Sequence, residues 1–125
     1  MIGLNDLEQA VLNKLLAGDH PVLATLREQA SQARLARREC TGVGFYCDIE
    51  VDSNAPTVRG DFHIGDVHGE LDGLAHGAGF VLFIRCGRVS MLEGFTYDEP
   101  WPGQIQGFSL KYSDPERKAE LAKLG

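Results

Sequence analysis

The sequence predicts an α+β domain in which N-terminal helices pack on one face of a four- to five-stranded, mostly antiparallel sheet, with a short C-terminal helix. Apolar residues recur at helical spacing in the first third of the chain, and from Thr41 onward they alternate as strand residues do. A chain of 125 residues buries roughly two-thirds of its unfolded surface, which is enough for one core. We therefore expect residues 1–125 to form a single domain.

Two helices are predicted before residue 40. Asn5 followed three positions later by Glu8 is typical of a capping box, and the apolar pattern that follows stops at Gly18, a common residue after a helix end. A second helix begins near Pro21, which suits a first helical turn, and its Ala/Arg/Gln-rich composition extends the predicted helix to about Glu39. We expect the two helices to form an antiparallel pair or a bent layer.

Strands are predicted from the change of period onward. Residues 43–51 alternate cleanly and indicate a half-buried strand. Residues 58–71 form a poorer strand whose apolar pattern shifts near Gly65, which predicts a β-bulge there. A last strand over residues 108–112 precedes the short terminal helix.

The segment from Ala78 to Pro102 is the most informative part of the chain. It predicts a hairpin that is apolar on both faces, which favours a central position in the sheet. With Gly87-Arg88 as a two-residue turn, Leu82 faces Glu93 across the hairpin. Glu93 then carries the only charge on an otherwise apolar face. Cys47 and Cys86 alternate in step with apolar neighbours on their strands, which predicts that both are core cysteines.

The charge of the chain is concentrated in one segment. Residues 48–72 hold seven of the 18 acids and one of the 12 bases, so the net charge of −6 arises there. This asymmetry disfavours nucleic acid and favours a basic protein or a cation. Asp48, Glu50 and Asp52 share one face of the first strand, with carboxylates about 7 Å apart, and are the predicted partner-binding acids. The alternative is a solvated outer face or one that protects an edge strand.

Composition also indicates a compartment. The three cysteines are an odd number without CxxC spacing, which predicts neither a disulfide framework nor a zinc ribbon and favours a reducing cytoplasm. Asp6 and Glu8 stand where a signal peptide needs bases, and the longest apolar run is seven residues, against the ~20 that a spanning helix needs. We expect a cytoplasmic protein with no membrane partner.

Three segments resemble a group of small, uncharacterised bacterial proteins, in which a TGVGF strand precedes an LEG-aromatic-T-aromatic…WP segment. They are Thr41–Tyr46, His76–Phe80 and Leu92–Pro102, and the last is the specific part. The resemblance covers about half of the chain, residues 41–102. It implies a compact α+β domain in a bacterial cytoplasm, and it transfers no catalytic residue because the group has no established activity.

Glu93 is the single residue that most strongly indicates a pocket. A carboxylate on an apolar face costs several kcal/mol unless it is paired. Glu93 is therefore either a tuned group in a pocket, together with Tyr97 and His76, or a residue near the strand end that accepts from backbone amides or pairs with Arg59 or Arg85. A hydrolase or metal-dependent enzyme would use Glu93 with His68 or His76, all in the same stretch of sequence.

Two further features have a functional and a structural interpretation. His63, Asp66 and His68 are metal-ligand types, but strand parity separates the histidines unless the predicted bulge realigns them, so no metal site is predicted. Trp101, between two prolines, is either an interface anchor or a residue that packs over the end of the sheet.

The leading hypothesis from sequence is a non-catalytic binding protein. In this hypothesis the acidic strand face of Asp48, Glu50 and Asp52 meets a basic protein partner and Trp101 supplies an apolar anchor. The competing hypotheses are the enzyme built on Glu93 and a small-ligand sensor with a pocket beneath the Trp101 loop. No cofactor is predicted, and the exposed sheet edges leave both a monomer and a homodimer open.

Overall fold

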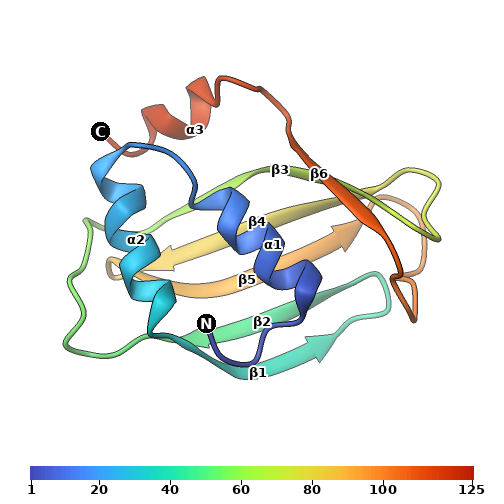
Figure 1. Ribbon diagram of the computed structural model, residues 1–125, viewed down its shortest axis with the longest axis horizontal. Helices are drawn as coiled ribbons and strands as arrows, with labels where there is room; N and C mark the ends of the chain where they lie inside the picture. The colour runs from blue at the N-terminus through green and yellow to red at the C-terminus, as the bar shows by residue number, and fades with distance from the viewer.

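The computed structural model describes all residues from Met1 to Gly125. Two helices are followed by six strands and a short last helix (Figure 1). The elements are α1 (Asp6–Leu15), α2 (Pro21–Ser31), β1 (Arg34–Cys40), β2 (Gly44–Glu50), β3 (Phe62–Leu71), β4 (Ala78–Arg85), β5 (Arg88–Thr96), β6 (Phe108–Tyr112) and α3 (Lys118–Ala122).

The six strands form one antiparallel sheet in the order β1-β2-β5-β4-β3-β6. Helices α1 and α2 lie across one face of this sheet, as Figure 1 shows, and the other face carries no helix. The predicted α+β class, the helical layer and the short C-terminal helix are therefore confirmed. The hairpin of β4 and β5 occupies the centre of the sheet, also as predicted, and the predicted bulge in β3 is present between Ile64 and Val67.

The prediction of four to five strands was wrong because the second helix is shorter than its composition indicated. It ends at Ser31, and residues 34–40 form the edge strand β1, which pairs with β2 from Arg34↔Glu50 to Cys40↔Phe45. Arg and Ala have high helix propensity, but propensity is a weak prior that tertiary pairing overrides. A further backbone contact holds the start of this strand, since Leu35 N–H donates to Ile2 O at 2.8 Å.

The register predicted for the central hairpin was also wrong. The turn residues are Cys86 and Gly87, both with positive φ (51° and 74°), as a type I′ turn requires. Beyond this turn, a β-bulge at Ser90 shifts the register between Phe83 and Ile84. Leu82 pairs with Leu92 as a result, and Glu93 pairs with Val81 on the opposite face of the sheet. Cys86 is exposed at this turn rather than in the core, and its N–H donates to the Asp61 carboxylate at 2.7 Å.

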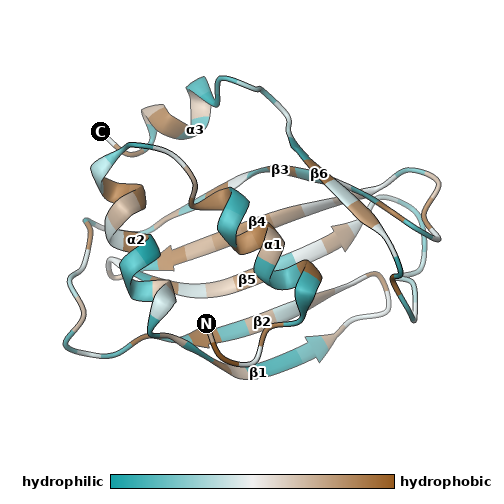
Figure 2. Cartoon of the chain, in the orientation of Figure 1, coloured by the Kyte–Doolittle hydropathy of each residue, from teal (hydrophilic) through white to brown (hydrophobic).

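The core fills the space between the helices and the covered face of the sheet. Figure 2 shows the apolar stripes of α1 and α2 and the apolar central strands that meet there. Cys47 is fully buried, as predicted. Gln29 of α2 is buried as well, and its side chain holds the central turn by donating to Gly87 O (2.9 Å) and accepting from Val89 N–H (2.9 Å). None of the helices has both the length and the apolar character needed to cross a membrane.

The C-terminal segment is fastened to the core by an ion pair. Arg117, which is 7% exposed, donates twice to the Asp66 carboxylate, at 2.6 and 2.9 Å. The same guanidinium donates to the carbonyls of Leu15 and Ala17, at the end of α1 (both 2.9 Å). Burial alone would lower the pKa of Arg117, but its bonds to Asp66 outweigh burial and raise that pKa, so Arg117 stays charged.

Candidate functional site

The open face of the sheet is the side that the helices leave uncovered. The strand register shows which residues share this face. Across the sheet, Tyr46 pairs with Glu93 and Glu93 with Val81, while Met91 pairs with Phe83 and Phe83 with His63. Its apolar centre is made of Tyr46, Val81, Phe83, Met91 and Phe95, all half-buried, and its rim carries Arg34, Arg37, Glu39, Asp48, Glu50, His63, His68, Glu70, Arg85 and Lys111.

Glu93 lies in the middle of this apolar centre. Its cross-strand neighbours are Tyr46 and Val81, and its neighbours on the same face of β5 are Met91 and Phe95. The Glu93 carboxylate acts on the Tyr46 hydroxyl across the β2–β5 pair, and its accepting oxygens and negative charge raise the pKa of Tyr46. None of these four neighbours is a base, so the carboxylate is half-buried without a cation beside it.

The predicted partner-binding acids have contacts within the chain. Glu50 forms an ion pair with Arg34 at 2.8 Å, and Asp48 lies opposite Arg37 across the β1–β2 ladder. Asp52 follows the strand, and its carboxylate accepts from Asn54 N–H at 2.9 Å. The sequence argument missed these bases because it placed them on a helix.

The acid-rich segment is continuous in sequence but divided in space. Strands β2 and β3 both belong to it, yet β5 and β4 lie between them in the sheet. With about 4.8 Å between neighbouring strands, their acids are separated by roughly 14 Å. Asp66 is buried against Arg117, and Asp61 caps the central turn. Residues 48–72 therefore do not form one continuous acidic patch.

Tyr97 and His76, which the sequence groups with Glu93, contact other residues. Tyr97 lies beside His68, with ring centroids 5.9 Å apart and a hydrogen bond of 3.3 Å between the Tyr97 hydroxyl and His68 Nδ1. His76 lies in the loop after β3, where its backbone N–H donates to the Glu99 carboxylate at 2.9 Å. This bond and a similar one from Ala75 lower the pKa of Glu99.

The bulge in β3 brings both histidines of the HxxDxH cluster to the open face. His63 pairs with Phe83 and His68 with Gly79, four positions apart along β4, so their rings are roughly 13 Å apart along the strand. Asp66 is buried against Arg117. No group of three or more His, Cys, Asp or Glu side chains is arranged to hold a metal ion.

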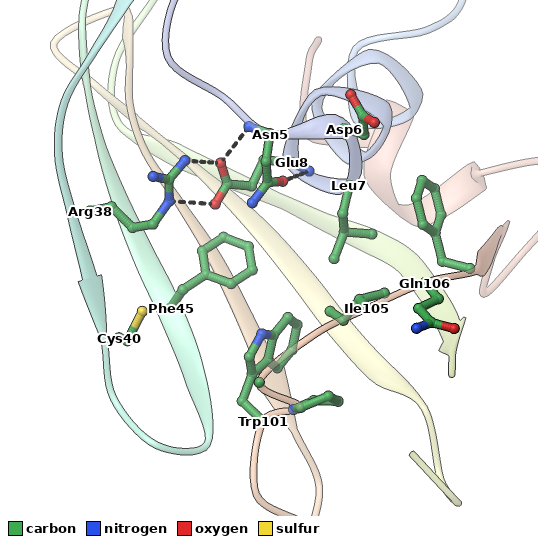
Figure 3. Close-up of a pocket in the computed structure, with 13 residues that line it drawn as sticks. Asn5, Asp6, Leu7, Glu8, Arg38, Cys40, Phe45, Trp101, Ile105 and Gln106 are labelled. Carbon is green, nitrogen blue, oxygen red and sulfur yellow. Dashed lines mark hydrogen bonds and ion pairs between the residues drawn. The ribbon is translucent and has the colours of Figure 1, made fainter. Parts of the chain in front are cut away.

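A cleft of about 360 Å³ lies beneath the Trp101 loop, on the helix side of the sheet (Figure 3). Trp101 is half-buried, with its ring 5.3 Å from Phe45 and 6.5 Å from Phe80, so it packs over the end of the core and lies away from the open face. Other residues that line the cleft include Asn5, Asp6, Leu7, Glu8, Arg38, Cys40, Ile105, Gln106 and Phe108.

An ion pair between α1 and β1 forms one wall of this cleft. Glu8 is 1% exposed and accepts from Arg38 Nε at 2.8 Å and Nη2 at 2.5 Å, and from Asn5 N–H at 3.0 Å. Burial works to raise the pKa of Glu8, but the bonds from Arg38 and Asn5 outweigh it, so that pKa is lowered. Sequence reasoning found the capping box of Glu8 and missed this pair, because it placed Arg38 on a helix.

Comparison of the chain with protein-family models, with curated proteins and with solved structures gave no match. Two surfaces of the chain are the candidate sites: the open face with Glu93 at its centre, and the cleft beneath Trp101.

Proposed function

We propose that the protein is a non-catalytic binding protein that engages a basic protein partner through the open face of its sheet. The observation that carries this proposal is the composition of that face. Protein interfaces are enriched in aromatic residues, Met and Arg and depleted in Lys. The open face has three aromatic rings and Met91 at its centre, three arginines on its rim and one lysine, Lys111.

Glu93 supports the basic character of the partner. A partner that covers the apolar centre removes water from this carboxylate, and a buried carboxylate without a counter-charge costs several kcal/mol. An arginine or lysine from the partner removes that cost and also contacts the neighbouring aromatic rings. Asp48 and Glu50, which already face Arg37 and Arg34, then act at the rim, where exposed pairs contribute little.

The proposal retains the binding role expected from sequence and changes the residues that carry it. Glu93 takes the central place, and Trp101 is left out because its ring packs on the opposite side of the sheet. The compartment we propose is a reducing bacterial cytoplasm. Three free thiols, two of them exposed (Cys40 and Cys86), support the reducing environment.

A capture experiment with matched charge reversals tests the proposal. Wild type, Glu93→Lys and Glu28→Lys serve as baits in lysate of the source organism. Glu28 is exposed on α2, so Glu28→Lys makes the same charge change on the helix side. We expect a basic protein that wild type and Glu28→Lys retain and Glu93→Lys loses. Identical protein sets from all three baits, or a partner lost only with Glu28→Lys, would contradict the proposal.

A second bait measures the acids at the rim. The triple variant Asp48→Asn, Glu50→Asn, Asp52→Asn removes the charges that Arg34 and Arg37 offset in part. We expect it to retain the partner with reduced recovery, because rim charges act mainly on the association rate and its salt dependence. Complete loss of the partner with the triple variant and full retention with Glu93→Lys would move the site to the end of β2.

A further inference from the structure

We propose that the cleft beneath Trp101 is a second binding site, which takes an uncharged, planar aromatic amide or N-heterocycle. The cleft lies on the helix side of the sheet, so this inference is independent of the partner surface on the open face. Its volume of about 360 Å³ falls in the range of roughly 300–1,000 Å³ that is usual for small-molecule sites.

The apolar walls of the cleft favour a flat ring. Trp101 and Phe45 meet edge to face, with 75° between their ring planes, and Ile105 and Leu7 complete this part of the wall. Figure 3 shows these four side chains around one common space. Aromatic ligands bind such walls by stacking and edge contacts, which add to the burial of apolar surface.

The charges of the wall favour an uncharged ligand. Glu8 and Arg38 neutralise each other in a two-bond ion pair, and Glu8 also accepts from the Asn5 backbone, so its carboxylate has no oxygen left without a partner. Asp6 is exposed, and Figure 3 shows its carboxylate turned away from Trp101. A charged ligand would thus lose its water in the cleft without gaining a counter-charge, which is unfavourable.

Two carboxamides favour a ligand with neutral hydrogen-bonding groups. The Asn5 side-chain oxygen accepts from Glu8 N–H (2.9 Å), and Figure 3 shows the amide nitrogen turned toward the rings of Phe45 and Trp101. Gln106 supplies a second carboxamide on another side of the cleft. Carboxamides offer both donors and acceptors, which an amide group or a ring nitrogen can complement.

The single tryptophan of the chain makes the cleft directly observable. Its indole N–H gives one cross-peak in a ¹H–¹⁵N spectrum, which is followed during titration with benzamide, benzoate or benzylammonium. These probes share one ring and differ in charge. We expect a saturable shift with benzamide and a Kd roughly tenfold lower than for either charged probe, because charge burial is unfavourable. No saturable shift with benzamide, or equal or tighter binding of a charged probe, would overturn the inference.

Variants test whether the cleft holds the ligand. Ile105→Glu places a carboxylate in its wall, and Val22→Glu makes the same change in a different cleft. We expect benzamide binding to be lost in the first and retained in the second. If Ile105→Glu does not fold, the exposed Gln106→Ala is used, for which a several-fold weaker affinity is expected. Wild-type affinity in whichever of these two cleft variants folds would assign benzamide to another surface.

Discussion

The two faces of the sheet differ in how their polar groups are paired. On the covered face, Glu8 is bonded to Arg38 and Asp66 to Arg117, and each pair has further backbone partners. On the open face, Glu93 is half-buried among apolar neighbours, and the residue opposite it on β2 is Tyr46 rather than a base. The charged groups of the covered face are thus paired within the chain, whereas Glu93 on the open face is left for another molecule to pair.

The largest expected effect is on the covered face at Arg117. Arg117→Ala leaves the Asp66 carboxylate and the carbonyls of Leu15 and Ala17 without their donor. Because a buried charge without a partner is costly, we expect the free energy of unfolding to fall by about 4 kcal/mol. Urea denaturation followed by circular dichroism measures the change. A loss below about 1 kcal/mol would show that this pair does not fasten the C-terminal segment.

Neighbouring residues on β4 compare the two faces directly. Leu82 is fully buried on the covered face, and Phe83 is half-buried on the open face. We expect Leu82→Ala to cost about 3 kcal/mol, since it leaves a cavity, and Phe83→Ala to cost about 1 kcal/mol, since water already reaches the ring. Paired denaturation curves decide the matter, and equal losses would mean that Phe83 belongs to the core rather than to a binding surface.

The next expected effect is the pH dependence conferred by Glu8. Its pKa in the folded chain lies below the ordinary value of 4.5, so its stabilising effect is complete above that value and is lost as pH falls through the lower folded pKa. Glu8→Gln should cost about 2 kcal/mol at pH 7, less than a fully buried pair because Arg38 is partly exposed. The difference between the variant and wild type should shrink below pH 4. A difference that stays constant from pH 7 to pH 3 would contradict this account.

The smallest effect concerns thiol reactivity and leaves stability unchanged. Burial, followed by the charge of Glu8, raises the pKa of Cys47 to about 12. Because the thiolate is the reactive form, Cys47 should resist a disulfide reagent at pH 8 while the exposed Cys40 and Cys86 react. Two fast thiols in the native protein and three in denaturant are expected. Three fast thiols in the native protein would place Cys47 outside the core.

Much of the fold was predictable because, in most elements, the local sequence pattern favours the same secondary structure as the tertiary contacts. The capping box of α1 is present, with reciprocal bonds between Asn5 and Glu8. The alternation in β2 correctly separates the buried Phe45 from the exposed Asp48, since strand parity depends only on the period of the chain.

The errors arose where local signals were ambiguous. Residues 34–40 have the composition of a helix, and only pairing with β2 makes them a strand. In the central hairpin, Gly87-Arg88 was the expected turn, but the positive φ of Cys86 shifts the turn by one residue. Moving a two-residue turn by one position would leave the predicted faces of β5 unchanged. A β-bulge opposite Phe83 and Ile84 adds one residue to β5, so Glu93 lies on the open face rather than on the core side.

The position of the candidate site depends on the register of the hairpin and on where α2 ends, and the sequence determines neither. Glu93 and Trp101 were therefore predicted as candidates, but the face on which each lies was not. Glu93 was correctly seen as a carboxylate among apolar residues, though on the other face. The loop that carries Trp101 does cover a cleft, but its wall includes Arg38, whose partner Glu8 is 30 residues away in sequence. Such long-range pairs follow from the topology of the sheet and have no local signal.

Site-specific photo-crosslinking tests the central claim, that the open face is the binding surface, most directly. A photoreactive p-benzoylphenylalanine replaces Phe83 at the apolar centre of the open face or, as the control, Glu28 on the helix side. After irradiation in lysate of the source organism, the account predicts one defined basic-protein adduct from position 83 and none from position 28. No adduct at position 83, or the same adducts from both positions, would contradict it.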